Sequence, residues 1–437
     1  MAPRPQPTVD FRTGRSPRNL VLLARADPII CGHSTEARNL AEAALAAGFE
    51  RVHIVSYPLD VLAASELPLK PLESVPAYSA GISVDRPAPI GDYKVLDGRL
   101  GYAIAGHLVD LLAAFRGRTV VMNLYRVPHG QMVMQAVHAI RCLADLAPPT
   151  TIAEAVGSDI TNVVSNALQT GQVGAAATVL QNYLDHDLPV AVSRFTKDLI
   201  VAAGSEVDDR LGTRFAPQLE ARVAISYPAI DTAAYLTPPA AAEQDATLAR
   251  RGLTSDGYLL FLSRLTEAKG VDDLIRAYRA SRLRGWMPLV IGGTGPHEAT
   301  LRELAAGDPA IRFFNDVGDA EKRALMAGCH AYCLPSKPRP EFTETFGIAV
   351  VEAMLAGGRG PVVTTRTGGI PEATGDHCLY HAAGDVADLA ATLDRVAAMS
   401  DAQREAISSQ ARSHAARFDR AEILARLLAS PVLQAAA

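Results

Sequence analysis

Short runs of apolar and β-branched residues alternate with longer helical patterns along most of the chain. After Gly270, apolar side chains stand at i, i+3, i+4 and i+7, the spacing of a helix that lies on a sheet. Alternating strands and helices predict the α/β class, with parallel, doubly wound sheets. Helices are predicted near Thr35–Ala47, Gly101–Phe115 and Gly130–Ala147. The predicted strands are Asn19–Ala24, Arg51–Ser56, Thr119–Leu124, Pro189–Ser193, Tyr258–Leu262, Pro288–Ile291, Ile311–Phe314, Ala331–Leu334 and Pro361–Thr364.

Chain breakers divide this pattern into two halves. The segment from Tyr227 to Gly252 is rich in proline and alanine and has no strand pattern. We therefore expect two Rossmann-like domains that face a central ligand cleft. The predicted parts are a disordered tail at 1–18, a first domain at 19–230, a linker at 231–252, a second domain at 253–415 and a helix at 416–437 that crosses back to the first domain.

Composition narrows the class of protein further. The 437 residues exceed the ~250–300 at which single cores stop growing, which agrees with two domains. The 42 Lys+Arg and 47 Asp+Glu residues give a net charge of −5, which argues against nucleic-acid and anionic-membrane partners. The first apolar run, Leu20–Ala24, is too short for a signal core or a membrane span. Five scattered cysteines fit a reducing cytoplasm and form no metal-binding cluster.

The stretch Pro340–Met354 is the first candidate for binding chemistry. It follows a predicted strand and opens a helix, whose exposed amides, with Gly347, make a seat for phosphate. Glu344 precedes this helix and Glu352 lies eight residues later, so they are on the order of 12 Å apart. That separation excludes one acid/base pair and suits two ends of an extended ligand. The alternative is that Glu344 is only a carboxylate stabilised by the dipole of the helix it precedes, and that Glu352 is a solvated surface residue.

A second candidate is the strand-to-helix loop that carries Arg264 and Lys269. A doubly wound sheet presents ligands at such loops, and two cations there could neutralise a diphosphate leaving group without a metal. The alternative is two solvated surface charges. Gly32 opens a helix after the first strand and is a weaker ligand candidate. Gly292–Pro296 is interpreted as a strand-to-helix turn, and Asp185–Asp187 as a solvated turn rather than a metal site.

Together these elements resemble retaining glycosyltransferases of the GT-B fold, glycosyltransferase family 4, over about residues 19–415. Each motif is common, but their order along the chain is specific. The motifs are Ser-Arg-Leu-x-x-x-Lys-Gly at 263–270, Gly-Gly-x-Gly-Pro at 292–296, Leu-Pro-Ser at 334–336, Glu-x7-Glu from Glu344 to Glu352 and Gly-Gly-Ile-Pro-Glu at 368–372.

The resemblance implies a role for each matched residue. Arg264 and Lys269 would hold the donor diphosphate, Glu344 would contact sugar hydroxyls, and Glu352 would bind the ribose. No metal and no cofactor are implied, since the nucleoside-diphosphate sugar is a co-substrate. The backbone that would cover the sugar and phosphate comes from Thr345, Phe346, Gly347 and Ile348.

One departure from the family pattern lies at Glu154. Family members often carry a histidine near the donor sugar's C6 end, and the corresponding stretch here, Thr151–Asp159, has Glu154 instead. A carboxylate in a desolvated cleft is costly unless a cation pairs with it. That cation is either a protein group such as Arg126 or an amine on the donor. His129, the nearest histidine before Glu154 in the chain, is a candidate for the acceptor side of the same cleft.

The resulting hypothesis is a cytoplasmic, metal-independent, retaining glycosyltransferase that moves a sugar from a UDP- or GDP-sugar to a soluble small-molecule acceptor. Neither a nucleic-acid nor a membrane partner is expected. The Glu154 departure favours specialised-metabolite biosynthesis, with a lincosamide-type thioglycosyltransferase that joins a GDP-amino-octose to ergothioneine as one narrow candidate. The alternatives are a sucrose- or trehalose-type synthase, a sugar-nucleotide epimerase, and a non-catalytic sugar-nucleotide-binding protein.

Overall fold

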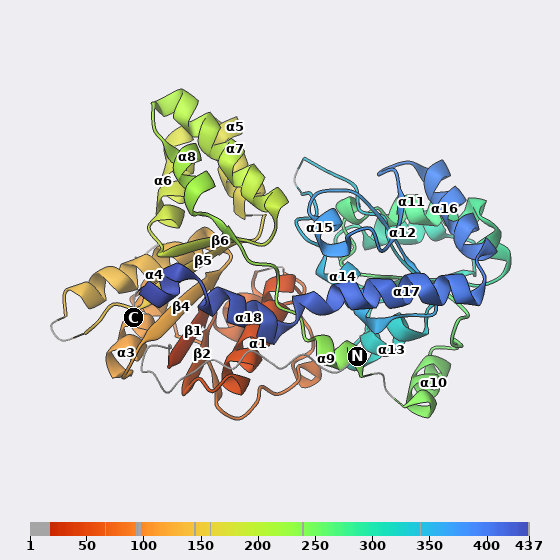
Figure 1. Cartoon of the computed structure of the whole chain (residues 1–437), viewed down its shortest axis with the longest axis horizontal. Helices are drawn as coiled ribbons and strands as arrows, with labels where there is room; N and C mark the ends of the chain where they lie inside the picture. The colour runs from red at the N-terminus through yellow and green to blue at the C-terminus, as the bar shows by residue number, and fades with distance from the viewer. Residues whose placement is uncertain are drawn as a thin grey trace. The chain divides into compact units, whose positions relative to one another are not determined.

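The computed structural model describes residues 18–435 except 66, 93, 95–97, 144–145, 158, 238–239 and 341. The tail predicted at 1–18 therefore lies outside the described residues, apart from Arg18. Ser158 and Glu341, which belong to two of the predicted motifs, also lie outside them. The chain forms two compact units (Figure 1). The first ends at Ala229 and takes in the chain again from Arg420, and the second is Ile230–Asp419.

A seven-stranded parallel sheet forms the centre of the first unit. Its strand order is β3-β2-β1-β4-β5-β6-β7. The strands are β1 (Asn19–Leu23), β2 (Arg51–Val55), β3 (Ile82–Asp85), β4 (Thr119–Leu124), β5 (Thr150–Ala155), β6 (Leu188–Ala191) and β7 (Ala224–Ile225). The helices are α1 (Gly32–Ala46), α2 (Leu59–Ala63), α3 (Gly98–Ala114), α4 (Arg126–Arg141), α5 (Ser165–Gln169), α6 (Val173–Leu184), α7 (Arg194–Leu211), α8 (Phe215–Arg222), α18 (Arg420–Leu428) and α19 (Pro431–Ala435).

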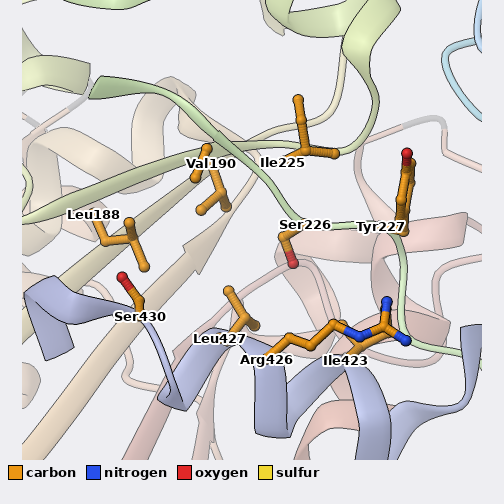
Figure 2. Close-up of a pocket in the computed structure, with 10 residues that line it drawn as sticks. Leu188, Val190, Ile225, Ser226, Tyr227, Ile423, Arg426, Leu427 and Ser430 are labelled. Atoms are coloured by element: carbon orange, nitrogen blue, oxygen red, sulfur yellow. The ribbon is translucent and has the colours of Figure 1, made fainter. Parts of the chain in front are cut away.

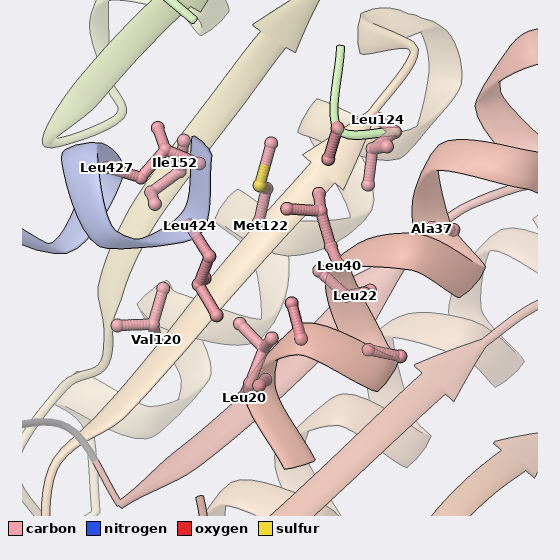
Figure 3. Packing of buried hydrophobic residues seen from close by; sticks show 14 of the residues in the cluster. Leu20, Leu22, Ala37, Leu40, Val120, Met122, Leu124, Ile152, Leu424 and Leu427 are labelled. Atoms are coloured by element: carbon pink, nitrogen blue, oxygen red, sulfur yellow. The ribbon is translucent and has the colours of Figure 1, made fainter. Parts of the chain in front are cut away.

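Alternation along β1 explains the layers of this unit. Leu20 and Leu22 face one side, where they pack with α1 and α18, and Val21 and Leu23 face the other side, where they pack with α3 and α4. Figure 3 shows the first of these cores, in which Leu424 of α18 lies among side chains of the sheet and α1. Helices α5, α6, α7 and α8 pack on one another in a separate apolar cluster.

The second unit is built on a six-stranded parallel sheet with the order β10-β9-β8-β11-β12-β13. Its strands are β8 (Leu259–Leu262), β9 (Leu289–Gly292), β10 (Ile311–Phe314), β11 (Ala331–Leu334), β12 (Val362–Thr365) and β13 (Leu379–His381). Its helices are α9 (Thr232–Leu236), α10 (Ala241–Arg250), α11 (Val271–Ala280), α12 (Glu298–Ala305), α13 (Asp319–Gly328), α14 (Ile348–Ala356), α15 (Ile370–Thr374), α16 (Val386–Ala398) and α17 (Asp401–Ala415).

The structure confirms the predicted α/β class with two doubly wound sheets. Each predicted strand corresponds to an observed strand within two residues at its ends, and the predicted apolar stripe of α11 is buried. Four strands were not predicted: β3, β5, β7 and β13. The segment expected to be a linker, 231–252, instead contains α9 and α10, which belong to the second unit.

Candidate functional site

The order of the second sheet directs attention to β8 and β11. These two strands are neighbours, and the chain leaves them toward β9 on one side and β12 on the other. In doubly wound sheets such a reversal leaves a crevice beyond the carboxyl ends of the two strands, where ligands bind. The loop after β8 carries Arg264 and Lys269, and the loop after β11 carries Glu344. The two predicted motifs therefore meet at this switch point.

Lys269 and Glu344 form a buried ion pair at the switch point. Nζ of Lys269 donates a hydrogen bond to Oε2 of Glu344, and their side chains are only 7% and 10% exposed. The Lys269 ammonium also lies 5.5 Å from the ring centroid of Phe342. The sequence assigned the two residues to separate roles, on phosphate and on sugar. The structure brings them into direct contact, so the position of each depends on the other.

Two glycines hold the loops of the site against one another. Gly270 has φ +68°, and a Cβ there would lie 2.0 Å from the carbonyl oxygen of Pro335. Gly368 has φ +58°, and a Cβ there would lie 2.0 Å from the carbonyl oxygen of Glu344. Only glycine tolerates both the left-handed backbone and the close approach. These contacts join the loops after β8, β11 and β12 by backbone packing.

Glu352 is positioned by two residues that the sequence analysis missed. Oη of Tyr235, on α9, and Nζ of Lys322, on α13, each donate to Oε1 of Glu352 at 2.7 Å. Burial, followed by the Glu352 carboxylate, raises the pKa of Tyr235 well above its usual value. Among the described residues no hydrogen bond reaches Oε2 of Glu352. The alternative interpretation of Glu352 as a solvated surface residue does not agree with the structure, because Glu352 is only 6% exposed. Tyr235 is 117 positions away in the chain, so no local pattern could have signalled it.

The other predicted donor-side residues differ in their exposure. Arg264 is exposed and makes no ion pair among the residues described. Thr345 and Phe346 are buried, and the Phe346 ring contacts the Phe418 ring edge-on at 5.0 Å. Gly347 is the N-cap of α14, which begins at Ile348.

In the first unit, Glu154 lies in the interior of the sheet on β5. Its side chain is fully buried, and neither carboxyl oxygen has a hydrogen-bond partner in the described part of the chain. Burial raises the pKa of Glu154 well above its usual value, and the carboxyls of Glu36 and Asp159 raise it further. Burial therefore disfavours the charged form of Glu154.

The neighbours of Glu154 also lie in the interior. Glu36, on α1, accepts a hydrogen bond from the backbone N–H of Ala229 at 3.1 Å, and burial raises its pKa to about 8. Asp159 accepts hydrogen bonds from the backbone N–H groups of Gly157 at 3.0 Å and Arg126 at 3.2 Å. These carboxyl groups form an acidic cluster with Glu154 that α1, β5 and the segment after β5 build together.

Arg126 and His129 are also buried. The Arg126 guanidinium lies 4.4 Å from the Tyr183 ring and donates to the carbonyl of Val179 at 2.9 Å, and no ion pair joins it to Glu154 within the described ranges. His129 is bonded through Nδ1 to the carbonyl of Leu124 and through Nε2 to the hydroxyl of Tyr57. Burial lowers the pKa of His129 to about 4, so this side chain is neutral at pH 7.

Gly32 is the first residue of α1, after the N-cap Cys31. The interpretation of Asp185–Asp187 as a solvated turn was wrong for its central residue. His186 is fully buried and bonded to Asn123 and to the carbonyl of Asn182. Asp187 accepts hydrogen bonds from the N–H and hydroxyl of Thr151. No group of three or more His, Cys, Asp or Glu side chains suited to a metal ion occurs among the residues described.

A cavity of about 170 Å³ lies elsewhere in the first unit, beside α18 (Figure 2). Leu188 and Val190 of β6 and Leu427 of α18 supply apolar walls, and Ser226 and Ser430 supply hydroxyls. None of the predicted site residues lines it. In the described chain no helix combines the length and the apolar character needed to cross a bilayer.

The two sheets place the chain in a known structural class. Anabaena Alr3699/HepE, solved in complex with UDP and glucose, superposes with a TM-score of 0.64 at 17% identity, over 93% of this chain and 98% of the other. Sucrose-phosphate synthase of Thermosynechococcus elongatus superposes with a TM-score of 0.63 at 17% identity, over 94% and 97% of the two chains. The fold is therefore GT-B, with two Rossmann-like units.

The family match lies within the second unit. Residues 246–414 match the family model for glycosyl transferases group 1. D-inositol 3-phosphate glycosyltransferase of Mycolicibacterium smegmatis is 29% identical over 217 residues, which cover 48% of this chain and 47% of the relative. Glycogen synthase of Mycobacterium tuberculosis is 33% identical over 208 residues, which cover 46% and 45%. The chain thus spans about half the length of the curated relatives it matches. Residues 246–414 are thus similar to glycosyl transferases group 1.

Proposed function

We propose that this chain is a glycosyltransferase that uses a nucleoside-diphosphate sugar and binds it in the second unit. The single observation that carries the proposal is the buried Lys269–Glu344 pair at the switch point between β8 and β11. Burying two charges is costly, and a contact with a purely structural role could be made by uncharged side chains. Two buried charges at a ligand crevice therefore indicate a role in binding. The match of residues 246–414 to glycosyl transferases group 1 supports this reading.

The donor diphosphate would meet positive charge from two sides. Arg264 is exposed and has no carboxylate partner among the residues described, so its full charge is available to phosphate. Lys269 uses one of its three N–H donors on Glu344 and keeps others for the ligand. Glu344, fixed by Lys269, would accept hydrogen bonds from sugar hydroxyls through Oε1. Oε2 of Glu352, whose Oε1 is held by Tyr235 and Lys322, would accept from the ribose.

As the reaction proceeds, negative charge grows on the leaving diphosphate. Arg264, Lys269 and the amides at the start of α14 would stabilise that charge without a metal ion. We further propose a retaining course, as the resemblance to family 4 implies, with front-face displacement assisted by the leaving diphosphate, because the motifs place no carboxylate as a covalent nucleophile. The five cysteines are all free thiols, which supports the expected location in the cytoplasm.

The finer proposal concerns the donor sugar and rests on Glu154. A fully buried carboxyl group without a hydrogen-bond partner would gain an ion pair from a ligand amine. This supports an aminated donor in specialised-metabolite biosynthesis, including a GDP-amino-octose transferred to a thiol. A sucrose- or trehalose-type synthase is the second candidate, favoured by the superposition on sucrose-phosphate synthase. The acceptor in both cases is a soluble small molecule.

A thermal-shift screen of the full chain with UDP-, GDP-, ADP- and dTDP-sugars tests the proposal. One nucleotide series should raise the melting temperature of the wild type and should fail to do so in Arg264→Ala. Arg282→Ala is a matched control, because Arg282 is an exposed arginine of the same unit that precedes β9, at the amino ends of the strands, whereas Arg264 follows the carboxyl end of β8. Slow hydrolysis of the bound donor, followed by NMR, separates an enzyme from a binding protein. The absence of any nucleotide response would overturn the proposal.

A further inference from the structure

The first sheet has a switch point of its own, between β1 and β4. The two strands pair in parallel, and the chain leaves them toward opposite edges of the sheet, β1 toward β2 and β4 toward β5. Arg25 lies two residues after the end of β1, and Tyr125 comes directly after β4. Both therefore stand at the carboxyl ends of the central strands, where a doubly wound unit binds small molecules. The sequence analysis assigned no role to either residue.

Arg25 carries a charge that no described carboxylate neutralises. Its guanidinium carbon lies 4.1 Å from the ring centroid of Tyr125, and its Nε is buried without a hydrogen-bond partner. No carboxylate in the described ranges forms an ion pair with Arg25. The nearest acid in the chain, Asp27, is bonded to Arg38 at 2.8 Å. An aromatic ring can cover the face of a guanidinium while its in-plane donors stay available.

Tyr125 is held in an unusual conformation. Its φ is +78°, a left-handed value that favours glycine, yet a tyrosine occupies the position directly before α4. Strained backbone of this kind is retained mostly at functional sites. The ring contacts Arg25 on one side, and the ring of His33, at the start of α1, lies 5.6 Å from it. The strained residue thus supplies the surface on which the arginine rests.

The surrounding groups leave the positive charge of Arg25 unopposed. His129 is neutral, because burial lowers its pKa to about 4 and the nearby charge of Arg25 acts in the same direction. The Tyr57 hydroxyl stays protonated, because burial raises its pKa to about 12 although the charge of Arg25 acts in the opposite direction. Burial also raises the pKa of Glu36 to about 8 and that of Glu154 well above its usual value. A ligand that enters here therefore meets the guanidinium of Arg25, whose charge no described carboxylate balances, which suits an anion.

We propose that Arg25, supported by Tyr125, binds an anionic group of the glycosyl acceptor, either a carboxylate or a phosphate. The assignment to the acceptor rests on the proposed function, since the donor is assigned to the second unit. The substrate class then becomes narrower: a small molecule that presents a sugar-accepting hydroxyl or thiol and also a carboxylate or phosphate. Both oxyanions suit the in-plane donors of a guanidinium.

The test titrates inorganic phosphate and, separately, acetate into the full chain saturated with UDP or GDP, by calorimetry. The nucleotide occupies the phosphate site of the second unit, so the added anion reports on the first. We expect one anion to bind in a 1:1 ratio and Arg25→Gln to weaken it roughly 10- to 100-fold, the effect of losing charge-assisted hydrogen bonds. Binding of phosphate alone identifies a phosphorylated acceptor, and binding of acetate alone identifies a carboxylate acceptor.

Two further variants separate binding from folding. Arg51→Gln is the matched control. Arg51 also lies over an aromatic ring, 5.3 Å from the ring of Phe115, but it stands at the amino end of β2. The Arg51→Gln variant should therefore bind the anion as the wild type does. Tyr125→Gly should leave the melting temperature unchanged or higher, because glycine suits the backbone, while anion affinity falls several-fold.

Absence of anion binding in the wild type, or equal binding in wild type and Arg25→Gln, overturns the inference. Full anion affinity in Tyr125→Gly overturns the role of the tyrosine. Failure of both UDP and GDP to bind instead overturns the proposed function, and with it the assignment to an acceptor.

Discussion

Nζ of Lys269 and Oε2 of Glu344 are hydrogen-bonded although 75 positions separate the two residues in the chain. Lys269 follows β8 and Glu344 follows β11, so the adjacency of these strands brings the two charges together. Both side chains are nearly inaccessible, and each is the ion-pair partner of the other. Removing either one leaves a buried charge without a partner. A substitution at one position therefore probes stability as well as ligand binding.

Lys269→Ala should destabilise the second unit by about 3–5 kcal/mol, because it leaves the buried Glu344 carboxylate unpaired. The double variant Lys269→Ala/Glu344→Ala should lose less than the sum of the two single variants. Urea-induced unfolding of the four proteins, followed by circular dichroism, measures this coupling. Additive losses would show that the pair contributes nothing beyond its separate side chains.

Arg264→Ala should lower kcat/KM for transfer by ~10²-fold and leave the unfolding midpoint unchanged, because Arg264 is exposed and unpaired in the described structure. This variant tests phosphate binding without the stability loss expected at Lys269. Kinetics with saturating acceptor give the comparison, with Arg282→Ala as the control. Full activity in Arg264→Ala is incompatible with its proposed role on the diphosphate.

Local pattern predicted the central strands β1, β4, β8 and β11, because their continuous apolar runs are buried on both faces. It did not predict β3 and β13, which are short edge strands with half-buried residues. It also missed β5, in which two threonines and Glu154 interrupt the apolar run although all six residues are buried. The motif order identified the loops of the site. It could not reveal the Lys269–Glu344 contact or the Tyr235 contact with Glu352, because tertiary packing creates both.

Glu154→Gln should impair an aminated donor much more than the matching hydroxyl donor. Loss of one side of a partly buried ion pair costs ~3–5 kcal/mol, against ~1–3 kcal/mol for an unsatisfied hydrogen bond. Measuring kcat/KM of wild type and variant with both donors decides the question. An equal loss for the two donors would leave Glu154 with no role in recognising an amine.

Glu36→Gln should make stability less dependent on pH. Burial raises the pKa of Glu36 from 4.5 to about 8, so the folded chain keeps a proton that the unfolded chain releases above pH 4.5. The stability linked to this group is therefore complete below pH 4.5 and is lost as the pH rises toward about 8. Relative to wild type, the variant should gain stability between pH 5 and pH 8, by on the order of several kcal/mol. Unfolding curves of both proteins at pH 5 and pH 8 measure this gain. An equal change in stability between the two pH values for wild type and variant would contradict the raised pKa of Glu36.

Transfer should continue in the presence of EDTA, and the product should keep the anomeric configuration of the donor. The first expectation rests on the cations Arg264 and Lys269, which would stabilise the leaving group, and the second on the motif resemblance to the retaining family. Product NMR and an EDTA titration are the measurements. An inverted product, or activity that EDTA abolishes and manganese restores, would be the contrary result.

Helix α18 has a consequence for the order in which the chain folds during synthesis. Leu424 and Leu427 complete the core of the first unit, yet they leave the ribosome after the whole of the second unit. Domains generally fold as units as they emerge, and at ~5–20 residues per second the second unit takes ~10–40 s to be made. During that time the first unit lacks α18, and the apolar surface that α18 covers stays exposed to solvent. The unit synthesised first is thus the last to be completed, and that interval is when chaperones would be needed most.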